Sequence, residues 1–498
     1  MTEKNRETFS SRLGFILVAV GCAVGLGNVW KFPYLCGQNG GAAFILIYLL
    51  CLAFLALPIL VCELSVGRAS RKSSAKSFDA LKPGGTHWHL SGYMCMAGTY
   101  LLMMFYTCVC GWMFYYFMLY MGGSLGGSVL PPEQIGDQFG DMLNSPLLMT
   151  MSTFFVIIMA FGICSLGVRK GVENVTKWMM IGLFVLIVVL AVHSLMLPGA
   201  DKGVAFYLVP DFGAVVENGI GKVVFAAMSQ AFFTLSIGIG AMSIFGSYLD
   251  RSRSLMSEGV IITVLDTLVA LFAGLTIIPA CFAYHIEPGA GPSLVFITMP
   301  TVFEHMMGGR IWGGLFFLFL AVAALSTVVA VFENIIAYAM DLWGWSRRKA
   351  VIVNLLSMCV LSIPCVLGFN VLSGLQPMGA GSSILDLEDF LVSYNFLPLG
   401  AIVYLLFCVS KNGWGWDNFI NEANAGKGMR FPAILRRFMI WGSPLLIVVI
   451  YLKGYYDTFA PMGTGYLVLW MFLAILFLCM VGFIAFKDTR KQEKRESA

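Results

Sequence analysis

The sequence predicts an all-α polytopic membrane protein with twelve transmembrane helices. Of its 498 residues, 59% are hydrophobic and only 12% are charged, a composition unlike that of soluble globular domains. A spanning helix needs about 20 mostly apolar residues, and twelve such stretches are present. The first and the sixth carry glycines at their centres, a pattern typical of transporters built from inverted repeats. We therefore expect two inverted five-helix repeats with broken first and sixth helices, followed by two C-terminal helices.

The predicted spans divide the chain into five segments. Their centres lie near Val24, Leu55, Phe105, Phe155, Phe184, Leu235, Leu268, Leu320, Leu356, Gly400, Leu446 and Leu473. The segments are a cytoplasmic N-terminal segment (1–12), the first repeat (13–197), the second repeat (198–411), the two C-terminal helices (412–486) and a cytoplasmic tail (487–498).

Basic residues gather in alternate loops between the predicted spans. The loops on one side hold Arg68, Arg71, Lys72, Arg169, Lys170, Arg251, Arg253, Arg347, Arg348, Arg436 and Arg437. The loop from Gly122 to Pro146, on the other side, has three acids and no base. Because cytoplasmic loops are enriched in Lys and Arg, we expect both termini inside and a plasma-membrane location, which in a prokaryote is the inner membrane. The net charge of +4 therefore reflects insertion in a lipid bilayer, and nucleic-acid binding is not expected.

The first predicted span is weakened at its middle by the segment Gly21 to Pro33, which reads GCAVGLGNVWKFP. An unpaired backbone group costs several kcal/mol in hydrocarbon, so such a break survives only where protein or ligand satisfies the freed groups. The sixth span, Ser229 to Tyr248, is interrupted in the same way around Ser236, Gly238 and Gly240. Glycines that only let helices pack closely are the alternative. The two breaks at corresponding positions favour a binding site at the midplane.

Enzyme motifs are weak in this chain. The five histidines never form an HExxH pair or another ligand spacing. Gly122 to Gly126 matches the nucleophile-elbow pattern, but it follows a predicted span and enters a Gly/Pro-rich loop. The 13 cysteines lie almost entirely within predicted spans and indicate neither a disulfide framework nor a metal cluster. We therefore expect no enzyme activity.

Ordered motifs over nearly the whole chain resemble the neurotransmitter:sodium symporter family, in its prokaryotic amino-acid branch. They are NRETFSSRLGF, GLGNVWKFP, NGGAAF, KGVE, QAFFTLSIGIG and ALST. The resemblance implies a leucine-transporter fold that takes up an amino acid together with sodium ions by alternating access, without an organic cofactor. A transport-inactive amino-acid sensor of the same fold is the alternative. The oligomeric state is left open, with a homodimer as one option.

An unwound helix offers carbonyl oxygens to a cation and free amides to a carboxylate. By resemblance, two sodium sites use the broken first helix. The first site takes Ala23, Asn28, Thr234 and Asp266. The second takes the carbonyls of Gly21, Val24 and Ala323 with the hydroxyls of Ser326 and Thr327. A Ser-Thr pair in an apolar helix otherwise tends to bond to its own backbone carbonyls.

The expected substrate class depends on Gly25. Monoamine members of the family carry Asp at this position, whereas amino-acid members keep it small so that the substrate carboxylate meets sodium and the backbone amides. This chain is therefore expected to carry an amino acid, with Tyr106 holding the carboxylate. The apolar lining predicts a hydrophobic or aromatic side chain. The substrate-binding residues expected by resemblance are Ala23, Gly25, Leu26, Gly27, Leu102, Tyr106, Phe233, Thr234, Ser236, Ile239, Thr327 and Val331.

Asp266 is a departure from many family members, which have asparagine here. Chloride-dependent members complete an anion site with a serine one turn later, where this chain has Ala270 beside Tyr48 and Gln230. We expect Asp266 to supply the negative charge that chloride gives elsewhere, so that transport is chloride-independent. A structural acid bonded to neighbouring helices is the alternative reading.

The family's gates also have counterparts in this sequence. Lys31 and Asp389 are expected to form the outer ionic gate above Phe233 and Tyr106; lysine lacks the bidentate fork of the arginine often found there. The inner gate is expected to pair Arg6 with Asp341, near Ser247 and Tyr248. Glu63 matches a residue that braces the broken sixth helix.

The fifth span departs from the family at its inner end. Family members often place proline ten residues after the glycine of the KG motif, but here Gly171 is followed by Ile181 and Gly182. Inward opening by unwinding of this helix is therefore less strongly predicted.

Overall fold

Long apolar helices make up most of the protein. The computed structural model describes residues 9–125, 132–285 and 294–487. Within these residues, ten helices are long and apolar enough to cross a membrane, and the first span adds an eleventh that is bent by 54° at its break. The short apolar helix α12 (Ile220–Thr234) and α13 (Ala241–Ser247) together make the sixth span. The predicted all-helical fold with broken first and sixth helices is confirmed.

Short helices lie between the first five spans and after the fifth. In chain order these elements are α1 (Arg12–Ala23), η1 (Gly27–Lys31) and α2 (Phe32–Gln38), then α3 (Ala42–Cys51), η2 (Leu52–Ala56) and α4 (Leu57–Ser70), then α5 (Ser74–Leu81), α6 (His89–Gly122), α7 (Pro132–Asn144), α8 (Pro146–Ser165), η3 (Val168–Glu173), α9 (Asn174–Leu195), α10 (Ala200–Leu208) and α11 (Phe212–Glu217).

The second half begins with the broken pair α12 and α13. It continues with α14 (Leu255–Ala283), η4 (Leu294–Thr298), α15 (Met299–His305), α16 (Gly309–Trp343), α17 (Arg347–Leu367), α18 (Ile384–Leu391), η5 (Val392–Phe396), α19 (Leu397–Val409), α20 (Trp416–Ala423), η6 (Ala433–Leu435), η7 (Phe438–Gly442), α21 (Ser443–Phe459), η8 (Ala460–Met462) and α22 (Thr464–Phe486).

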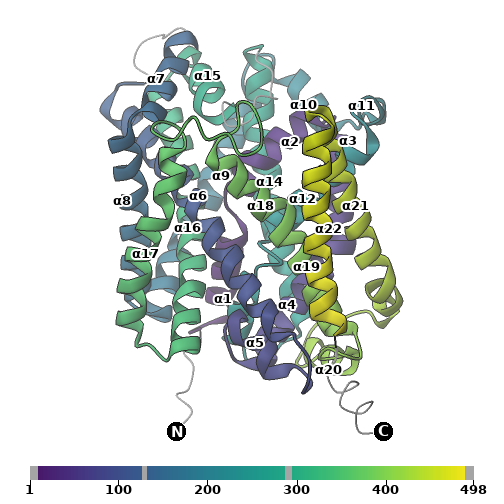
Figure 1. Ribbon diagram of the computed structural model, residues 1–498. Helices are drawn as coiled ribbons and strands as arrows, with labels where there is room; N and C mark the ends of the chain where they lie inside the picture. The colour runs from purple at the N-terminus through teal and green to yellow at the C-terminus, as the bar shows by residue number, and fades with distance from the viewer. Residues whose placement is uncertain (1–8, 126–131, 286–293, 488–498) are drawn as a thin grey trace, which may run out of the picture.

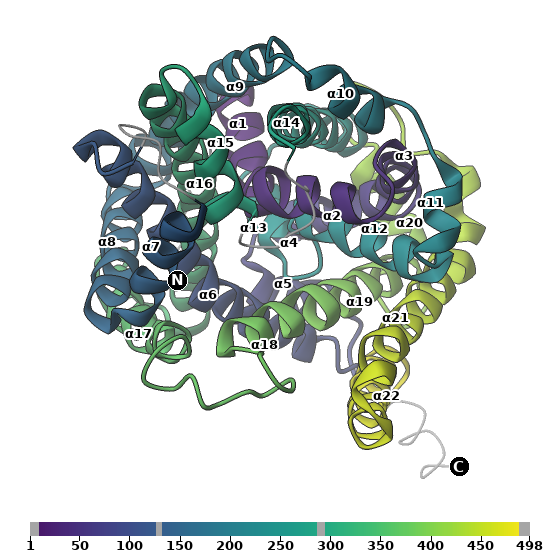
Figure 2. The same cartoon turned by 90° about the horizontal axis from the view of Figure 1, so that it is seen from above.

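The broken first helix lies inside the bundle. Every residue of α1 from Gly14 to Ala23 is buried, although the segment is apolar enough to face lipid. α16 is also mostly buried, whereas α22 exposes most of its residues at the rim of the bundle (Figure 2). The start of α1 and the end of α22 lie at the same face of the molecule (Figure 1). The strongly apolar helix α22 is thus peripheral, and the glycine-broken first helix lies in the interior.

The second break runs from Leu235 to Gly240 and has a backbone that few residues adopt. Ser236, Gly238 and Gly240 have φ values of 51°, 97° and 74°, in the left-handed region where a side chain other than glycine is strained. Ser236 is the one of the three that is not glycine, and such strained residues cluster at functional sites. The interruption of α12 and α13 therefore follows from its glycines and places a strained serine at the centre of the bundle.

Candidate functional site

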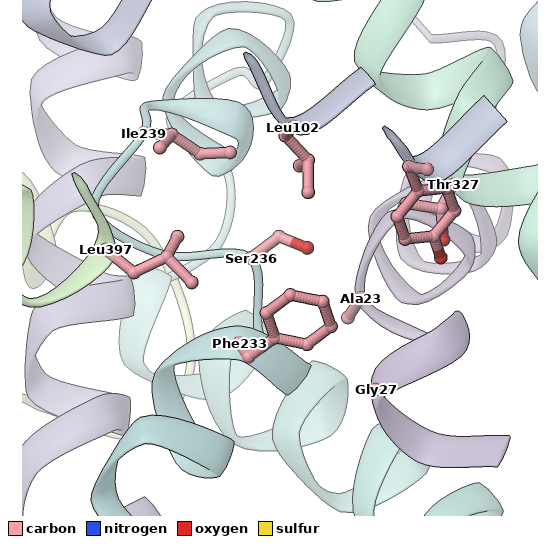
Figure 3. A pocket seen from close by; sticks show the side chains of 9 residues that line it. Ala23, Gly27, Leu102, Phe233, Ser236, Ile239, Thr327 and Leu397 are labelled. Atoms are coloured by element: carbon pink, nitrogen blue, oxygen red, sulfur yellow. The ribbon is translucent and has the colours of Figure 1, made fainter. Parts of the chain in front are cut away.

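The two helix breaks meet at a buried cavity. Ser236 Oγ, in the second break, donates a hydrogen bond of 3.1 Å to the carbonyl oxygen of Cys22, next to the first break. The cavity between the breaks also receives side chains from α6, α16 and α19 (Figure 3). Its lining residues are Ala23, Gly27, Leu102, Tyr106, Phe233, Ser236, Ile239, Thr327 and Leu397.

Most of the substrate-binding residues expected from the sequence line this cavity. Four do not. Val331 is fully buried on α16, one turn beyond Thr327. Gly25 and Leu26 lie at the first break and contribute backbone amides, and Thr234 turns its hydroxyl to Asp266. Leu397 lines the cavity although sequence analysis did not select it. In the sequence it is one of many apolar residues in the tenth predicted span, so no local signal distinguished it.

Backbone amides of the first break face one end of the cavity. Leu26 N donates to Tyr106 Oη at 2.9 Å, and Gly25 N donates to Asn28 Oδ1 at 3.1 Å. A β-carbon at Gly25 would lie 2.0 Å from Tyr106 Oη and 2.5 Å from Thr327 Oγ1. The glycine therefore lets the tyrosine hydroxyl approach the unwound backbone, and no longer side chain fits between them.

Asp266, on α14, is fully buried at the end of the first break. Its Oδ1 accepts a 2.8 Å hydrogen bond from Asn28 Nδ2, and its Oδ2 accepts one of 2.9 Å from the Thr234 hydroxyl. Ala23 ends α1 and lines the cavity nearby. Asn28, Thr234 and Asp266, three of the residues expected at the first sodium site, thus come together from η1, α12 and α14, around a carboxylate that a cation would neutralise.

The residues expected at the second sodium site also come together, between α1 and α16. Ser326 Oγ donates to the carbonyls of Gly21 and Ala323 at 3.0 and 2.8 Å. Thr327 Oγ1 lies 3.2 Å from the Gly21 carbonyl and 3.1 Å from that of Val24. These contacts link five oxygens, and oxygen is the ligand atom that hard cations such as sodium prefer.

The side chains that would form a chloride site lie beside Asp266. Tyr48 and Gln230 are both fully buried, and Gln230 Nε2 donates to the Gly27 carbonyl at 2.7 Å. Ala270, one turn after Asp266 on α14, is buried and has no side-chain donor. The ionisable group in this set is the Asp266 carboxyl.

Lys31 and Asp389 form an ion pair above the cavity. Lys31 Nζ lies 3.2 Å from both carboxylate oxygens of Asp389 and 4.4 Å from the centre of the Phe233 ring. Ser393, which sequence analysis did not select, accepts a hydrogen bond from Lys31 and donates one to Asp389 at 2.6 Å. The pair is partly exposed on both sides, with 19% and 31% of the side chains accessible.

At the opposite end, only part of the expected inner gate can be examined. Arg6 lies outside the described residues, and the Asp341 carboxylate accepts a hydrogen bond of 2.6 Å from Ser73 N. The Ser247 hydroxyl donates to the Ile244 carbonyl of its own helix, α13. The Tyr248 hydroxyl donates to Glu333 Oε1 at 3.1 Å.

Glu333 was not selected from the sequence, although a carboxylate inside an apolar span is a readable signal of function. It is 1% exposed and forms an ion pair with Arg347 at the start of α17. Arg347 Nε in turn donates to the Cys164 carbonyl at the end of α8. The Tyr248 hydroxyl is therefore bound to a buried charge network that links α13, α16, α17 and α8.

Glu63 lies where the sixth helix is interrupted. It is fully buried on α4, and one of its carboxylate oxygens accepts a hydrogen bond from the Gly238 amide. At the inner end of the fifth span, Gly171 lies in the π-helical turn η3, and Ile181 and Gly182 continue the regular helix α9. Neither the π turn of η3 nor the similar turn η5 was readable from the sequence.

Comparisons with known proteins cover nearly the whole chain. The model of the Sodium:neurotransmitter symporter family matches residues 6–128 and 137–488. A sodium-dependent transporter of Haemophilus influenzae, described as uncharacterized, is 31% identical over 91% of this chain and 98% of its own length. The uncharacterized sodium-dependent transporter YhdH of Bacillus subtilis is 33% identical over the same shares. The crystal structure of MhsT in complex with L-phenylalanine superposes with a TM-score of 0.82, at 38% identity, over 90% of this chain and 100% of that one.

Proposed function

Because this chain belongs to the sodium:neurotransmitter symporter family of sodium-dependent transporters, we propose that it takes up an amino acid with a hydrophobic or aromatic side chain. Uptake is coupled to sodium, proceeds by alternating access and does not require chloride. The observation that carries this proposal is the contact of Tyr106 with the Gly25-Leu26 backbone.

That contact supports a carboxylate as the recognised group. The Tyr106 oxygen already accepts the Leu26 amide, so the tyrosine O–H is the donor in this contact that can turn to a ligand. The amide is at the N-terminal end of a half-helix, where the helix dipole favours negative charge. An amine-binding aspartate cannot replace Gly25 without displacing Tyr106, because even a β-carbon would lie 2.0 Å from its hydroxyl. Carboxylate recognition at this end of the cavity fits an amino acid and not a simple amine.

The rest of the cavity supports an apolar side chain. Leu102, Ile239, Phe233 and Leu397 line it with apolar side chains, and the hydroxyl of Ser236 is already bonded to the Cys22 carbonyl. MhsT, one of the similar proteins of known structure, was crystallised in complex with L-phenylalanine. A side chain with unpaired polar groups would lose its hydrogen bonds to water here, at ~1–3 kcal/mol each.

Sodium coupling is supported by the two groups of oxygens around the first break. Sodium at Asp266 would neutralise its carboxylate, and sodium at Thr327 would bind between α1 and α16. Sodium in both sites would therefore stabilise the conformation in which the broken first helix packs against α14 and α16. A ligand that binds one conformation more tightly shifts the equilibrium toward it.

Chloride independence rests on Asp266. Chloride-dependent relatives need an anion near the sodium and the substrate, and this chain has a buried carboxylate there and alanine at position 270. A second anion beside Asp266 would meet like-charge repulsion in a region of low dielectric constant.

The deciding experiment is uptake into proteoliposomes. A panel of labelled amino acids would be tested with an inward sodium gradient, with potassium replacing sodium, and with gluconate replacing chloride. We expect concentrative uptake of leucine-like or aromatic amino acids in sodium, equal rates in both anions, and no uptake of tyramine or other simple amines.

Each element of the proposal has its own contrary outcome. Uptake that stops in gluconate would refute chloride independence, and uptake of amines alone would refute carboxylate recognition. Sodium-dependent binding without accumulation would identify the protein as a transport-inactive sensor.

A further inference from the structure

Leu397 reaches the cavity from α19, a helix that belongs to neither broken span. Its side chain is 2% exposed and lines the cavity together with Ile239 and Leu102. In Figure 3 it lies across the cavity from Thr327 and Ala23. Leu397 thus forms part of the wall opposite the Gly25-Tyr106 end of the cavity.

This position decides what Leu397 would touch, provided that the proposed function holds. A substrate whose carboxylate binds at Tyr106 and the Leu26 amide extends its side chain toward the opposite wall. Figure 3 places Leu397 and Ile239 on that side, with Phe233 below and Leu102 above. The distal atoms of the substrate side chain would therefore meet the Leu397 methyl groups.

The backbone that carries Leu397 is held against the second helix break. A β-carbon at Gly238 would lie 2.1 Å from the Leu397 carbonyl oxygen, and one at Gly400 would lie 1.9 Å from the Gly238 carbonyl oxygen. Two backbones approach this closely only where neither residue has a side chain. A movement of α19 that enlarged the cavity would therefore have to separate the Leu397–Gly400 backbone from Gly238.

The same segment is tied to α21 on its other side. Asn395 Oδ1 accepts hydrogen bonds from the Tyr451 and Tyr455 hydroxyls, at 2.8 and 2.6 Å, and all three residues are buried. Asn395 belongs to the π-helical turn η5, which ends immediately before Leu397. The Leu397 backbone is therefore packed against the second break on one side and hydrogen-bonded, through Asn395, to α21 on the other.

We propose that Leu397 sets the upper size limit for the substrate side chain. A rigid wall excludes side chains that are too long by steric overlap, and overpacking of a well-packed site by extra methylenes is unfavourable. One methylene in an apolar pocket changes discrimination by about 10- to 200-fold.

The test compares Leu397→Ala with Leu399→Ala. Leu399 is a matched control because it is buried on the same helix, two residues away, and does not line the cavity. For each variant, kcat/KM for sodium-dependent uptake is measured with labelled leucine, phenylalanine and tryptophan. Leu397→Ala is expected to raise the tryptophan-to-leucine ratio at least tenfold, Leu397→Phe to lower it at least tenfold, and Leu399→Ala to keep the wild-type ratio.

Equal ratios in the wild type, Leu397→Ala and Leu399→Ala would overturn the inference while leaving the proposed function intact. Absence of any sodium-dependent amino-acid uptake by the wild type would instead refute the proposed function. If Leu397→Ala does not fold, Leu397→Val removes a single carbon and must still raise the ratio; an unchanged ratio in that folded variant would overturn the inference equally.

Discussion

Gly25 leaves room for the Tyr106 hydroxyl, since a β-carbon at this position would lie 2.0 Å from Tyr106 Oη and 2.5 Å from Thr327 Oγ1. One hydrogen atom in place of a side chain therefore decides how close α6 and α16 come to the unwound backbone. The same contact brings the tyrosine hydroxyl to the Leu26 amide. The proposed recognition of a substrate carboxylate depends on this close approach.

Tyr106→Phe is expected to raise the KM for substrate by ~10- to 100-fold, because a hydrogen bond to a charged group contributes ~1.5–3 kcal/mol. The measurement is sodium-dependent uptake by purified variants in proteoliposomes. Tyr100→Phe is the matched control on the same helix, since its hydroxyl bonds to Asn354 instead of facing the cavity. An equal rise of KM in both variants would contradict a specific role for Tyr106.

Asp266→Asn is expected to make transport chloride-dependent. The substitution keeps one acceptor oxygen, which can serve Asn28, and replaces the other by an NH2 group that can donate to the Thr234 hydroxyl. It removes the negative charge that would balance bound sodium. Uptake by this variant should fall at least tenfold when gluconate replaces chloride, and adding Ala270→Ser should raise the apparent affinity for chloride. Equal uptake in both anions would assign Asp266 a structural role.

At the scale of elements, the broken sixth helix depends on a carboxylate from α4. Glu63 is fully buried and accepts the Gly238 amide, and the amides of Gly240, Met242 and Ser243 also face it. Backbone amides freed by a helix break need acceptors inside a membrane protein. The Glu63 carboxylate on α4 supplies such acceptors to the break between α12 and α13. The break is therefore stabilised by a residue of a different helix.

Glu63→Gln is expected to destabilise the protein by ~1–3 kcal/mol, because the glutamine NH2 group would face backbone donors in a buried site. The measurement is the midpoint of thermal unfolding in detergent. Glu217→Gln, at the exposed end of α11, should change the midpoint little, since surface substitutions away from such features stay within about 0.5 kcal/mol. Equal midpoints for the two variants would show that Glu63 does not brace the break.

At the scale of the whole molecule, the proposed cation sites lie between elements that are far apart in sequence. The second one joins carbonyls of the first span to hydroxyls of α16. Gly21 and Ser326, which are hydrogen-bonded there, are 305 residues apart in the chain. A ligand that binds only the folded arrangement stabilises it, by ~2.7 kcal/mol at a hundredfold excess over Kd.

Sodium is therefore expected to raise the thermal midpoint of the wild type relative to potassium. Thr327→Ala should remove most of this sodium-dependent rise. Thr276→Ala should keep it, because the Thr276 hydroxyl bonds only within its own helix, to the Phe272 carbonyl. A rise of equal size in Thr327→Ala would place the stabilising sodium elsewhere.

Much of the architecture was readable from the chain. Apolar length predicts the spans, and paired glycine interruptions predict two broken helices, because both properties are local and the bilayer allows few alternatives. The motifs around Gly25, Tyr106 and Asp266 predicted most of the residues that the structure brings together at the cavity.

The roles of Leu397 and Ser393, and the partners of Glu333, needed the tertiary structure. Leu397 reads as one of many apolar residues in a span, and it lines the cavity where α19 packs closely against Gly238. Ser393 binds Lys31 of η1, and Glu333 of α16 pairs with Arg347 at the start of α17. Both partners therefore lie on other elements. The sequence by itself therefore determined the class, the spans and the broken helices, which depend on local composition. Tertiary structure alone decided which side chains from distant helices face one another across the breaks, because that depends on packing between segments far apart in the chain.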